Sequence, residues 1–381
     1  MIRPVPSFVL PGMFYALDRY MRSRHSDYAN FVIAQPLDEP RSSLAALRDA
    51  LFPVARNAHT WICEENWHPL GVAQARARPG NLAWDLTFLA AMTRRDDQPA
   101  FAAAQDEALL ELVQYALNAA IMRGVHRVFA RVEDERPELE IFGKLSFQRY
   151  ARELTYWLPS ATDGLDALAP DPDAERASSA NGTAANASVP LRPWHRHDDW
   201  GLLRLYDSCT PKRVQMAEGL TGDEFVQTRA GGGRTWYLPL VEPHCVAYVY
   251  DRGVRLGGWM RLRLGRGSQP HQLWLMAHPD EPGVPRALLR SALGMLAREA
   301  PRPVLCLARE YEGHIVDALR AGGFEQCAAH ALLVRHLLMR ALWKREVPAV
   351  EPRILYGVKG IGTSSTRMSE GEKAHYATHD H

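Results

Sequence analysis

The chain has 381 residues, and the same order of secondary-structure signals occurs in it twice. Each copy has a strand, a polar turn, a leucine-rich helix, a second strand, a short helix, a Phe and a last strand. Leu109 lies 38 residues before Phe147, and Leu288 lies 36 residues before Phe324; in both copies a glutamate lies 14 residues before that Phe. A repeat of this length indicates that each copy is one structural unit. We therefore expect two α/β domains of the same type.

The boundaries of the two domains follow from composition. Residues 160–192 contain no aromatic residue and are rich in Ala, Asp, Ser, Pro, Asn and Gly. Such a segment cannot bury enough apolar surface to offset the entropy lost on ordering. The sequence therefore predicts a first domain over 1–159, a flexible linker over 160–192, a second domain over 193–345 and a flexible tail over 346–381.

The expected elements come from hydrophobic periodicity and from Gly and Pro at segment ends. In the first copy the strands are residues 82–91, 125–132 and 151–158, and the helices are residues 109–121 and 137–145. In the second copy a hairpin (246–250 and 256–264) and a strand (272–277) precede a helix (287–298), a strand (304–308), a helix (314–321) and a strand (331–338).

Charge and cysteine content exclude several classes of function. Lys and Arg total 45 and Asp and Glu total 44, so a net charge of +1 gives no electrostatic reason to expect binding to nucleic acid or to an anionic membrane. No apolar window is long enough to span a bilayer. The five cysteines are widely spaced and form no C-x-x-C motif, which favours reduced thiols in a cytoplasmic protein.

Two segments of the second copy carry a family resemblance. They are HPDEPGVPRALL at 278–289 and LRAGGF at 319–324. With the order of elements around them, they resemble the GNAT superfamily of acyl-CoA-dependent N-acyltransferases, over residues 10–158 and 193–340. The resemblance implies two tandem α/β domains, each a mixed sheet flanked by helices, with acetyl-CoA as co-substrate and no metal.

The first of these segments corresponds to the loop that holds the pyrophosphate of acyl-CoA at a helix N-terminus. Gly283 fits the first glycine of the family pattern, but Pro285 occupies the second glycine position and supplies no N–H. Asp280 and Glu281 place carboxylates beside the expected diphosphate, which is unfavourable unless Arg286 or Arg290 offsets them. Carried over by position, the residues that contact the co-substrate are Leu275, Met276, Ala277, Gly283, Val284, Arg286 and Ala287.

The corresponding loop of the first copy departs further from the family pattern. Ala104 and Asp106 fall on the two glycine positions. We expect Asp106 to cap the following helix, and a capping carboxylate would repel a phosphate. The first copy is therefore expected to be a structural copy that does not hold CoA.

Candidate catalytic groups lie at strand ends of the second copy. The family often uses a Tyr as the acid, but Leu319 and Phe142 occupy that position here, so Tyr311 is the aromatic hydroxyl left in the segment. Glu310 and His278 are the candidate bases, because they end the two strands that separate around CoA. Either residue is as readily interpreted as a solvated strand-end residue.

A second polar cluster follows the linker. His195, His197, Asp198 and Asp199 could in principle bind a metal, but a solvated polar turn explains them better because no remote ligand is identifiable.

The sequence thus predicts an N-acyltransferase that transfers an acetyl group from acetyl-CoA to a small-molecule or peptide amine, with the second copy active. The alternative is a non-catalytic tandem GNAT-fold protein that binds a ligand or a partner. The sequence leaves a homo-oligomer open.

Overall fold

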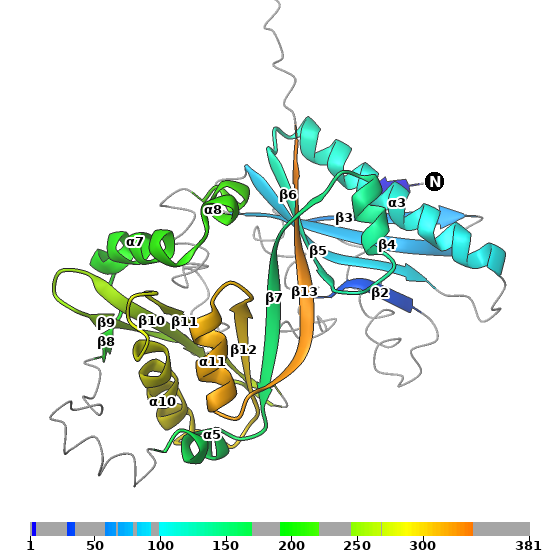
Figure 1. Ribbon diagram of the computed structural model, residues 1–381. Coiled ribbons are helices and arrows are strands. Elements are labelled where there is room, and N and C mark those ends of the chain that lie inside the picture. Colours follow the sequence, from blue (N-terminus) through cyan, green and yellow to red (C-terminus); the bar gives the residue numbers. More distant parts are fainter. Residues whose placement is uncertain are drawn as a thin grey trace, which may run out of the picture. The chain divides into compact units, whose positions relative to one another are not determined.

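The computed structural model is shown in Figure 1. The described residues are 2–4, 29–34, 58–65, 68–78, 82–92, 99–169, 191–220, 245–267 and 269–337. The predicted tail and most of the predicted linker lie outside them.

The first copy contains the elements up to β7. Its strands are β1 (Ile2–Pro4), β2 (Ala29–Ala34), β3 (Ala58–Glu65), β4 (His68–Ala77), β5 (Ala83–Met92), β6 (Arg127–Glu133) and β7 (Gln148–Leu158). Its helices are α3 (Pro99–Met122) and α4 (Leu139–Lys144). The predicted elements are all present. The strands preceding β5 were not predicted, because their mixed polar and aromatic sequence has no clear period.

The second copy follows α5 (Ala161–Ala167). Its strands are β8 (Leu191–Pro193), β9 (Cys245–Asp251), β10 (Leu256–Arg263), β11 (His271–Ala277), β12 (Val304–Arg309) and β13 (Glu325–His336). Its helices are the 3-10 helix η3 (Arg196–Asp198), α7 (Asp199–Cys209), α8 (Lys212–Glu218), α10 (Val284–Leu296) and α11 (Gly313–Ala321). The predicted hairpin is β9–β10, and the order strand–helix–strand–helix–strand matches that of the first copy.

The two copies exchange their last strands. The described strands form one mixed sheet in the order β1-β3-β4-β5-β6-β13-β7-β12-β11-β10-β9-β8, with β2 paired to β5 outside this path. Strand β7 of the first copy pairs with β12 of the second, and β13 of the second copy pairs with β6 of the first. Strands β7 and β13 also pair with each other and run side by side through the centre of Figure 1. Each copy is therefore completed by a strand from the other.

The hydrophobic cores follow the same exchange. The core under α3 contains Ala331 and Leu333 of β13 together with residues of the first copy. The core under α10 and α11 contains Leu154, Tyr156 and Leu158 of β7. Burial of these strands joins the two copies, because neither core is complete without apolar side chains from the other half.

Helix α3 begins earlier than the sequence suggested. It starts at Pro99, so Ala104 and Asp106 lie inside the helix, and Asp106 is not its cap. A proline is favoured in the first helical turn, and here it sets the start of α3 ahead of the predicted loop. No helix in the part of the chain that the structure describes is long and apolar enough to cross a membrane.

The predicted linker also begins too early. Residues 161–167 form α5, whose first turn is capped by Ser160: its Oγ accepts a hydrogen bond from the N–H of Thr162 at 3.2 Å. Ala161 and Leu168 are buried, and Leu165 packs against the same core. Their spacing along one helical face supplies an apolar stripe that the polar composition of the segment concealed.

Candidate functional site

Strands β11 and β12 separate part-way along their length. They pair in parallel from His271 opposite Val304 to Trp274 opposite Leu307, and no further. The N–H of Arg309 would continue the ladder, but it donates to Glu312 Oε2 at 2.8 Å instead. A fork therefore opens between β11 and β12 at the carboxyl ends of two parallel strands, which is where ligands bind in α/β folds.

The edge of β11 that faces the fork presents main-chain groups of alternate residues. The N–H of His271 donates to Pro303 O at 2.8 Å, so odd-numbered residues of β11 face β12. In agreement with this, Ala277 O accepts hydrogen bonds from His314 Nε2 at 3.1 Å and from the Cys209 thiol at 2.9 Å. Of the three predicted contact residues on this strand, Leu275 and Ala277 direct main-chain groups into the fork, whereas Met276 pairs with β10.

The corresponding fork of the first copy is occupied by β2. Strands β5 and β6 pair in parallel only from Ala83 to Asp85. Beyond that point β2 pairs antiparallel with β5, from Phe88 to Met92. Since β4 holds the other edge of β5, β2 lies on the edge that faces the fork. In the first copy, β2 therefore pairs with the main-chain groups of β5 that correspond to the open groups on β11.

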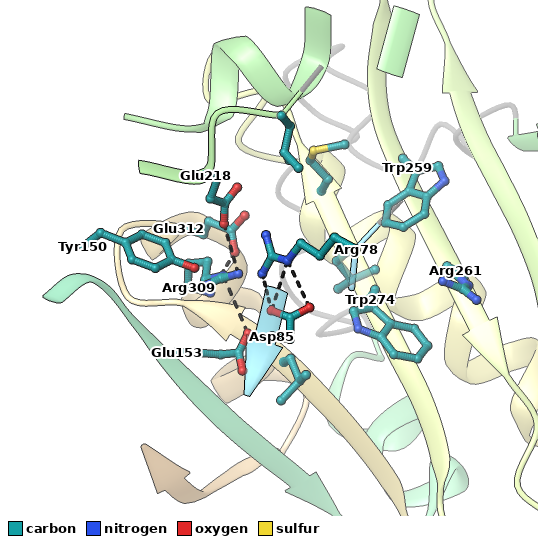
Figure 2. A pocket seen from close by; sticks show the side chains of 14 residues that line it. Arg78, Asp85, Tyr150, Glu153, Glu218, Trp259, Arg261, Trp274, Arg309 and Glu312 are labelled. Atoms are coloured by element: carbon teal, nitrogen blue, oxygen red, sulfur yellow. Dashed lines mark hydrogen bonds and ion pairs between the residues drawn. The ribbon is translucent and has the colours of Figure 1, made fainter. Parts of the chain in front are cut away.

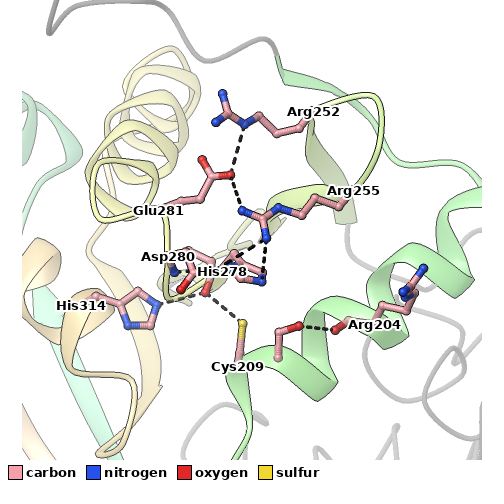
Figure 3. A network of polar contacts seen from close by, with 10 residues as sticks. Arg204, Cys209, Arg252, Arg255, His278, Asp280, Glu281 and His314 are labelled. Atoms are coloured by element: carbon pink, nitrogen blue, oxygen red, sulfur yellow. Dashed lines mark hydrogen bonds and ion pairs between the residues drawn. The ribbon is translucent and has the colours of Figure 1, made fainter.

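The loop between β11 and α10 has its carboxylates neutralised by the β9–β10 hairpin. Glu281 Oε1 lies 3.2 Å from Arg252 Nε and 3.5 Å from Arg255 Nη2, and Arg255 also lies 3.9 Å from Asp280. Figure 3 shows this chain of charges from Arg252 through Glu281 to Arg255. The arginines that pair with these carboxylates are therefore Arg252 and Arg255 of the hairpin and not the expected Arg286 or Arg290. Arg290 donates to Leu168 O instead.

The remaining predicted loop residues begin α10. Gly283 is the N-cap, exposed, and a Cβ added there would meet no atom within 4 Å. Val284 is buried beneath the helix, Arg286 is exposed, and the N–H of Ala287 donates to Gly283 O at 3.2 Å. The N-terminus of α10 is therefore open to solvent, with Arg286 beside it.

A cavity of about 410 Å³ lies at the base of the β11–β12 fork. Figure 2 shows its side chains, which come from both copies. The lining residues are Arg78, Asp85, Tyr150, Glu153, Glu218, Leu220, Trp259, Arg261, Trp274, Leu275, Met276, Leu307, Arg309 and Glu312. Strand exchange brings β7, and with it Tyr150 and Glu153, to the fork of the second copy.

Most of the charges in the cavity are arranged in pairs. Glu153 lies 2.6 Å from Arg131 Nε and 3.6 Å from Arg309 Nε, and Arg309 Nη2 lies 3.4 Å from Glu218 Oε1. Burial would raise the pKa of Glu153, but Arg309 and Arg131 outweigh it and hold that pKa below its usual value. Nearby, Asp85 accepts hydrogen bonds at 2.6 to 3.0 Å from Arg78.

Tyr150 is the aromatic hydroxyl that lines the cavity. Burial raises the pKa of Tyr150 to about 12, and Arg309 lowers it only in part. The phenol is consequently protonated at neutral pH and can donate a proton or a hydrogen bond.

The predicted catalytic residues lie outside the cavity lining. Glu310 is exposed and forms an ion pair with Arg152 at 3.0 Å. Tyr311 packs beside Val214 beneath α8. His278 lies in the loop, where its Nδ1 accepts a hydrogen bond from the N–H of Asp280 at 3.3 Å. Their catalytic roles stay predictions, whereas Tyr150, Glu153 and Glu218 are among the ionisable residues that line the cavity.

Sequence reasoning missed the cavity residues for a definite reason. Tyr150 and Glu153 belong to the first copy, whereas the residues predicted as acid and bases all lie in the second copy. Glu218 ends a helix that was not predicted. The sequence predicted a strand over 151–158, but a predicted strand carries no information about which copy β7 joins.

The polar cluster after the linker has a structural role. Asp198 is buried, accepts a hydrogen bond from the N–H of His195 at 2.8 Å, and pairs with Arg192 at 2.7 Å. The same guanidinium lies 2.7 Å from Asp251 on β9. These bonds fix the start of α7 against the sheet.

Comparison with known proteins agrees with this architecture. No protein-family model and no curated protein sequence matches the chain. Solved structures do match: a tandem GNAT protein from the clavulanic acid biosynthesis pathway superposes with a TM-score of 0.52, at 14% identity, over 88% of this chain and 98% of the other. The chain has the tandem GNAT fold. A GCN5-related N-acetyltransferase from Sphaerobacter thermophilus gives a TM-score of 0.51, at 13% identity, over 88% and 95% of the two chains. At these identities the likeness concerns the fold.

Proposed function

We propose that this protein is an acyl-CoA-dependent N-acyltransferase in which the second copy is active. The observation that carries the proposal is the contrast between the two forks. The β11–β12 fork leads directly to a charged cavity, because Leu275 and Leu307 at the fork also line it. In the first copy, the corresponding edge of β5 is paired with β2.

The residues of the second copy fit an acyl-CoA. The main chain of Leu275 and the N–H of Ala277 offer a strand edge to the pantetheine, and the N-terminus of α10 at Gly283 offers N–H groups to the diphosphate. Arg252 and Arg255 offset the loop carboxylates that would otherwise repel it. The Pro285 position lacks an N–H, so we expect binding to be weaker than a full set of donors would give.

The chemistry required is nucleophilic acyl transfer. The acceptor nitrogen, after losing a proton, attacks the thioester carbonyl carbon; the new C–N bond forms, the C–S bond breaks, and the departing sulfur takes a proton. The N–H of Ala277, which faces the fork, is placed to stabilise negative charge on the carbonyl oxygen. Tyr150 is the candidate proton donor to sulfur, since it is the tyrosine that lines the cavity.

We assign the base role to Glu218. Glu153 is held by two arginines, and its lowered pKa makes it a poor base. Asp85 accepts three hydrogen bonds from Arg78. Glu218 is buried and lines the cavity, and its contacts include a hydrogen bond of 2.6 Å from the Tyr206 hydroxyl and Arg309 Nη2 at 3.4 Å.

One observation favours a non-catalytic ligand-binding or interaction protein. The two positions where the family often has its acid are Leu319 and Phe142, which are 0% and 1% exposed and cannot donate a proton. Under this alternative the protein binds acetyl-CoA but acylates no amine.

Calorimetry with acetyl-CoA, followed by a thiol-release assay with an amine panel, tests the proposal. We expect Gly283→Trp to abolish binding, because the site around Gly283 is open and the indole would cover the loop without disturbing the fold. Gly294→Trp is the matched control, since Gly294 lies on the same helix with equally open surroundings. Absence of binding to the folded wild-type protein at millimolar acetyl-CoA would refute the proposal, and binding without turnover would favour the alternative.

A further inference from the structure

The cavity at the fork has two chemically different ends. Figure 2 shows Tyr150, Glu153 and Glu218 gathered around Arg309 at one end, and Trp259, Trp274 and Arg261 at the other. A volume of about 410 Å³ is within the usual range of small-molecule sites, which is about 300–1,000 Å³. The volume and the lining of the cavity therefore suit a small acceptor whose two ends differ chemically.

Arg261 differs from the other arginines of the cavity. Arg78 is bound by Asp85, and Arg309 lies beside two glutamates. Arg261 is partly buried, lies opposite Trp274 on the neighbouring strand with its guanidinium 5.2 Å from the indole centroid, and donates to Cys245 Sγ at 3.6 Å. Among the residues that the structure describes, no carboxylate forms an ion pair with it.

A guanidinium in such a place is suited to a carboxylate. Its planar array of donors matches the two oxygens, and stacking on Trp274 fixes its orientation. Trp259, which is 5% exposed, lies on the same face of β10 and adds apolar surface. This end of the cavity thus offers a cation beside an aromatic wall.

We propose, on the basis of the proposed function, that the acceptor is an amino acid or a similar amine that carries a carboxylate. Its carboxylate binds Arg261, its apolar side chain packs on Trp259 and Trp274, and its ammonium points toward Glu218. The nitrogen loses a proton and bonds to the acyl carbon of the acyl-CoA, the free thiol leaves, and the product is an N-acyl amino acid.

The reverse orientation is unfavourable. A carboxylate placed beside Glu153 and Glu218 would meet two like charges whose arginine is already shared between them. An ammonium beside Arg261 would meet a cation with no carboxylate partner among the described residues. The charge distribution therefore favours a zwitterion bound in one orientation, with its carboxylate at Arg261 and its ammonium toward Glu218.

Matched acceptor pairs test this inference. L-phenylalanine is compared with 2-phenylethylamine, and L-leucine with 3-methylbutylamine, in the thiol-release assay with acetyl-CoA. We expect at least one amino acid to exceed its decarboxylated partner by at least tenfold in kcat/KM, equivalent to about 1.4 kcal/mol. Arg261→Met should remove that preference by raising KM for the amino acid, and Arg261→Lys should restore part of it.

The control is Arg263→Met, because Arg263 lies on the same face of β10 and outside the cavity lining. It should leave the preference unchanged. Acylation of the amines with no preference for the carboxylate, or a preference that survives Arg261→Met, would overturn the inference while leaving the proposed function intact. Failure of acetyl-CoA to bind at all would refute the proposed function instead.

Discussion

Replacement of Arg131 by Met tests whether a buried charge cluster holds the exchanged strands together. Arg131 on β6 contacts Glu153 on β7 at 2.6 Å and His330 Nδ1 on β13 at 3.0 Å. The side chains of Arg131 and Glu153 are 18% and 11% exposed. One guanidinium therefore bridges the last strands of both copies.

The expected loss of stability follows from this geometry. Removing one partner of a buried ion pair leaves an uncompensated charge and costs about 3–5 kcal/mol. Glu153 retains Arg309, but at 3.6 Å, which is a weaker contact than the one removed. We therefore expect the free energy of unfolding to fall by about 3 kcal/mol at pH 8, the lower end of that range.

The loss should shrink at lower pH because of His330. Burial and Arg131 lower the pKa of His330 to about 4, against an ordinary value of 6.5. Between these values the unfolded chain binds a proton that the folded chain excludes, so wild-type stability falls as the pH drops. Without Arg131 the smaller of the two causes is lost while burial remains, so the pKa of His330 rises only part of the way toward its ordinary value. The difference between variant and wild type should be smaller at pH 5 by about 1 kcal/mol, half the full effect, because burial still lowers the pKa of His330 in the variant.

Urea unfolding at pH 8 and at pH 5, followed by tryptophan fluorescence, measures both effects. The matched control is Arg136→Met, whose partner Glu133 lies 3.0 Å away but whose pair is exposed at 34% and 50%. A surface pair is worth about 0–1 kcal/mol, so the control should change little. An Arg131→Met loss as small as that of the control, or one that is the same at both pH values, would refute the reasoning.

Three further outcomes are expected. Calorimetry should give one acetyl-CoA per chain, because β2 pairs along the fork of the first copy; a stoichiometry of two would contradict this. Gly258→Val should lower the free energy of unfolding by about 1–3 kcal/mol, because an added Cβ would lie 2.8 Å from Val284 Cγ1 and 2.9 Å from Leu288 Cδ1 on α10. An unchanged urea midpoint would contradict that close approach. Under native conditions a disulfide reagent that reacts with free thiols should modify exposed Cys245 rapidly and spare Cys306, because burial raises the pKa of the Cys306 thiol. Equal rates of modification, measured by peptide mapping, would show that β12 opens readily.

The sequence predicted the elements of the second copy closely because their signals are local. Helix α10 combines a proline in its first turn with leucines at helical spacing, and β9 and β10 surround a turn that contains Gly253 at φ +81°. The same signals did not predict α5, which lies where a flexible linker was expected. Three apolar residues in this polar segment were enough to form a helix with a buried apolar face. It also could not place the start of α3, where a proline competed with a potential cap.

The sequence by itself determined that two copies of one α/β unit are present. It also predicted that the first copy does not hold CoA, from Ala104 and Asp106, but Asp106 lies inside α3, and the strand that distinguishes the two forks is β2, which was not predicted. Only the tertiary structure decided which strands complete which copy. Strands β7 and β13 are both long, and main-chain hydrogen bonding is the same for either partner, so periodicity does not specify the exchange. That exchange moves Tyr150 and Glu153 of one copy into the cavity of the other, and the composition of the candidate site depends on it.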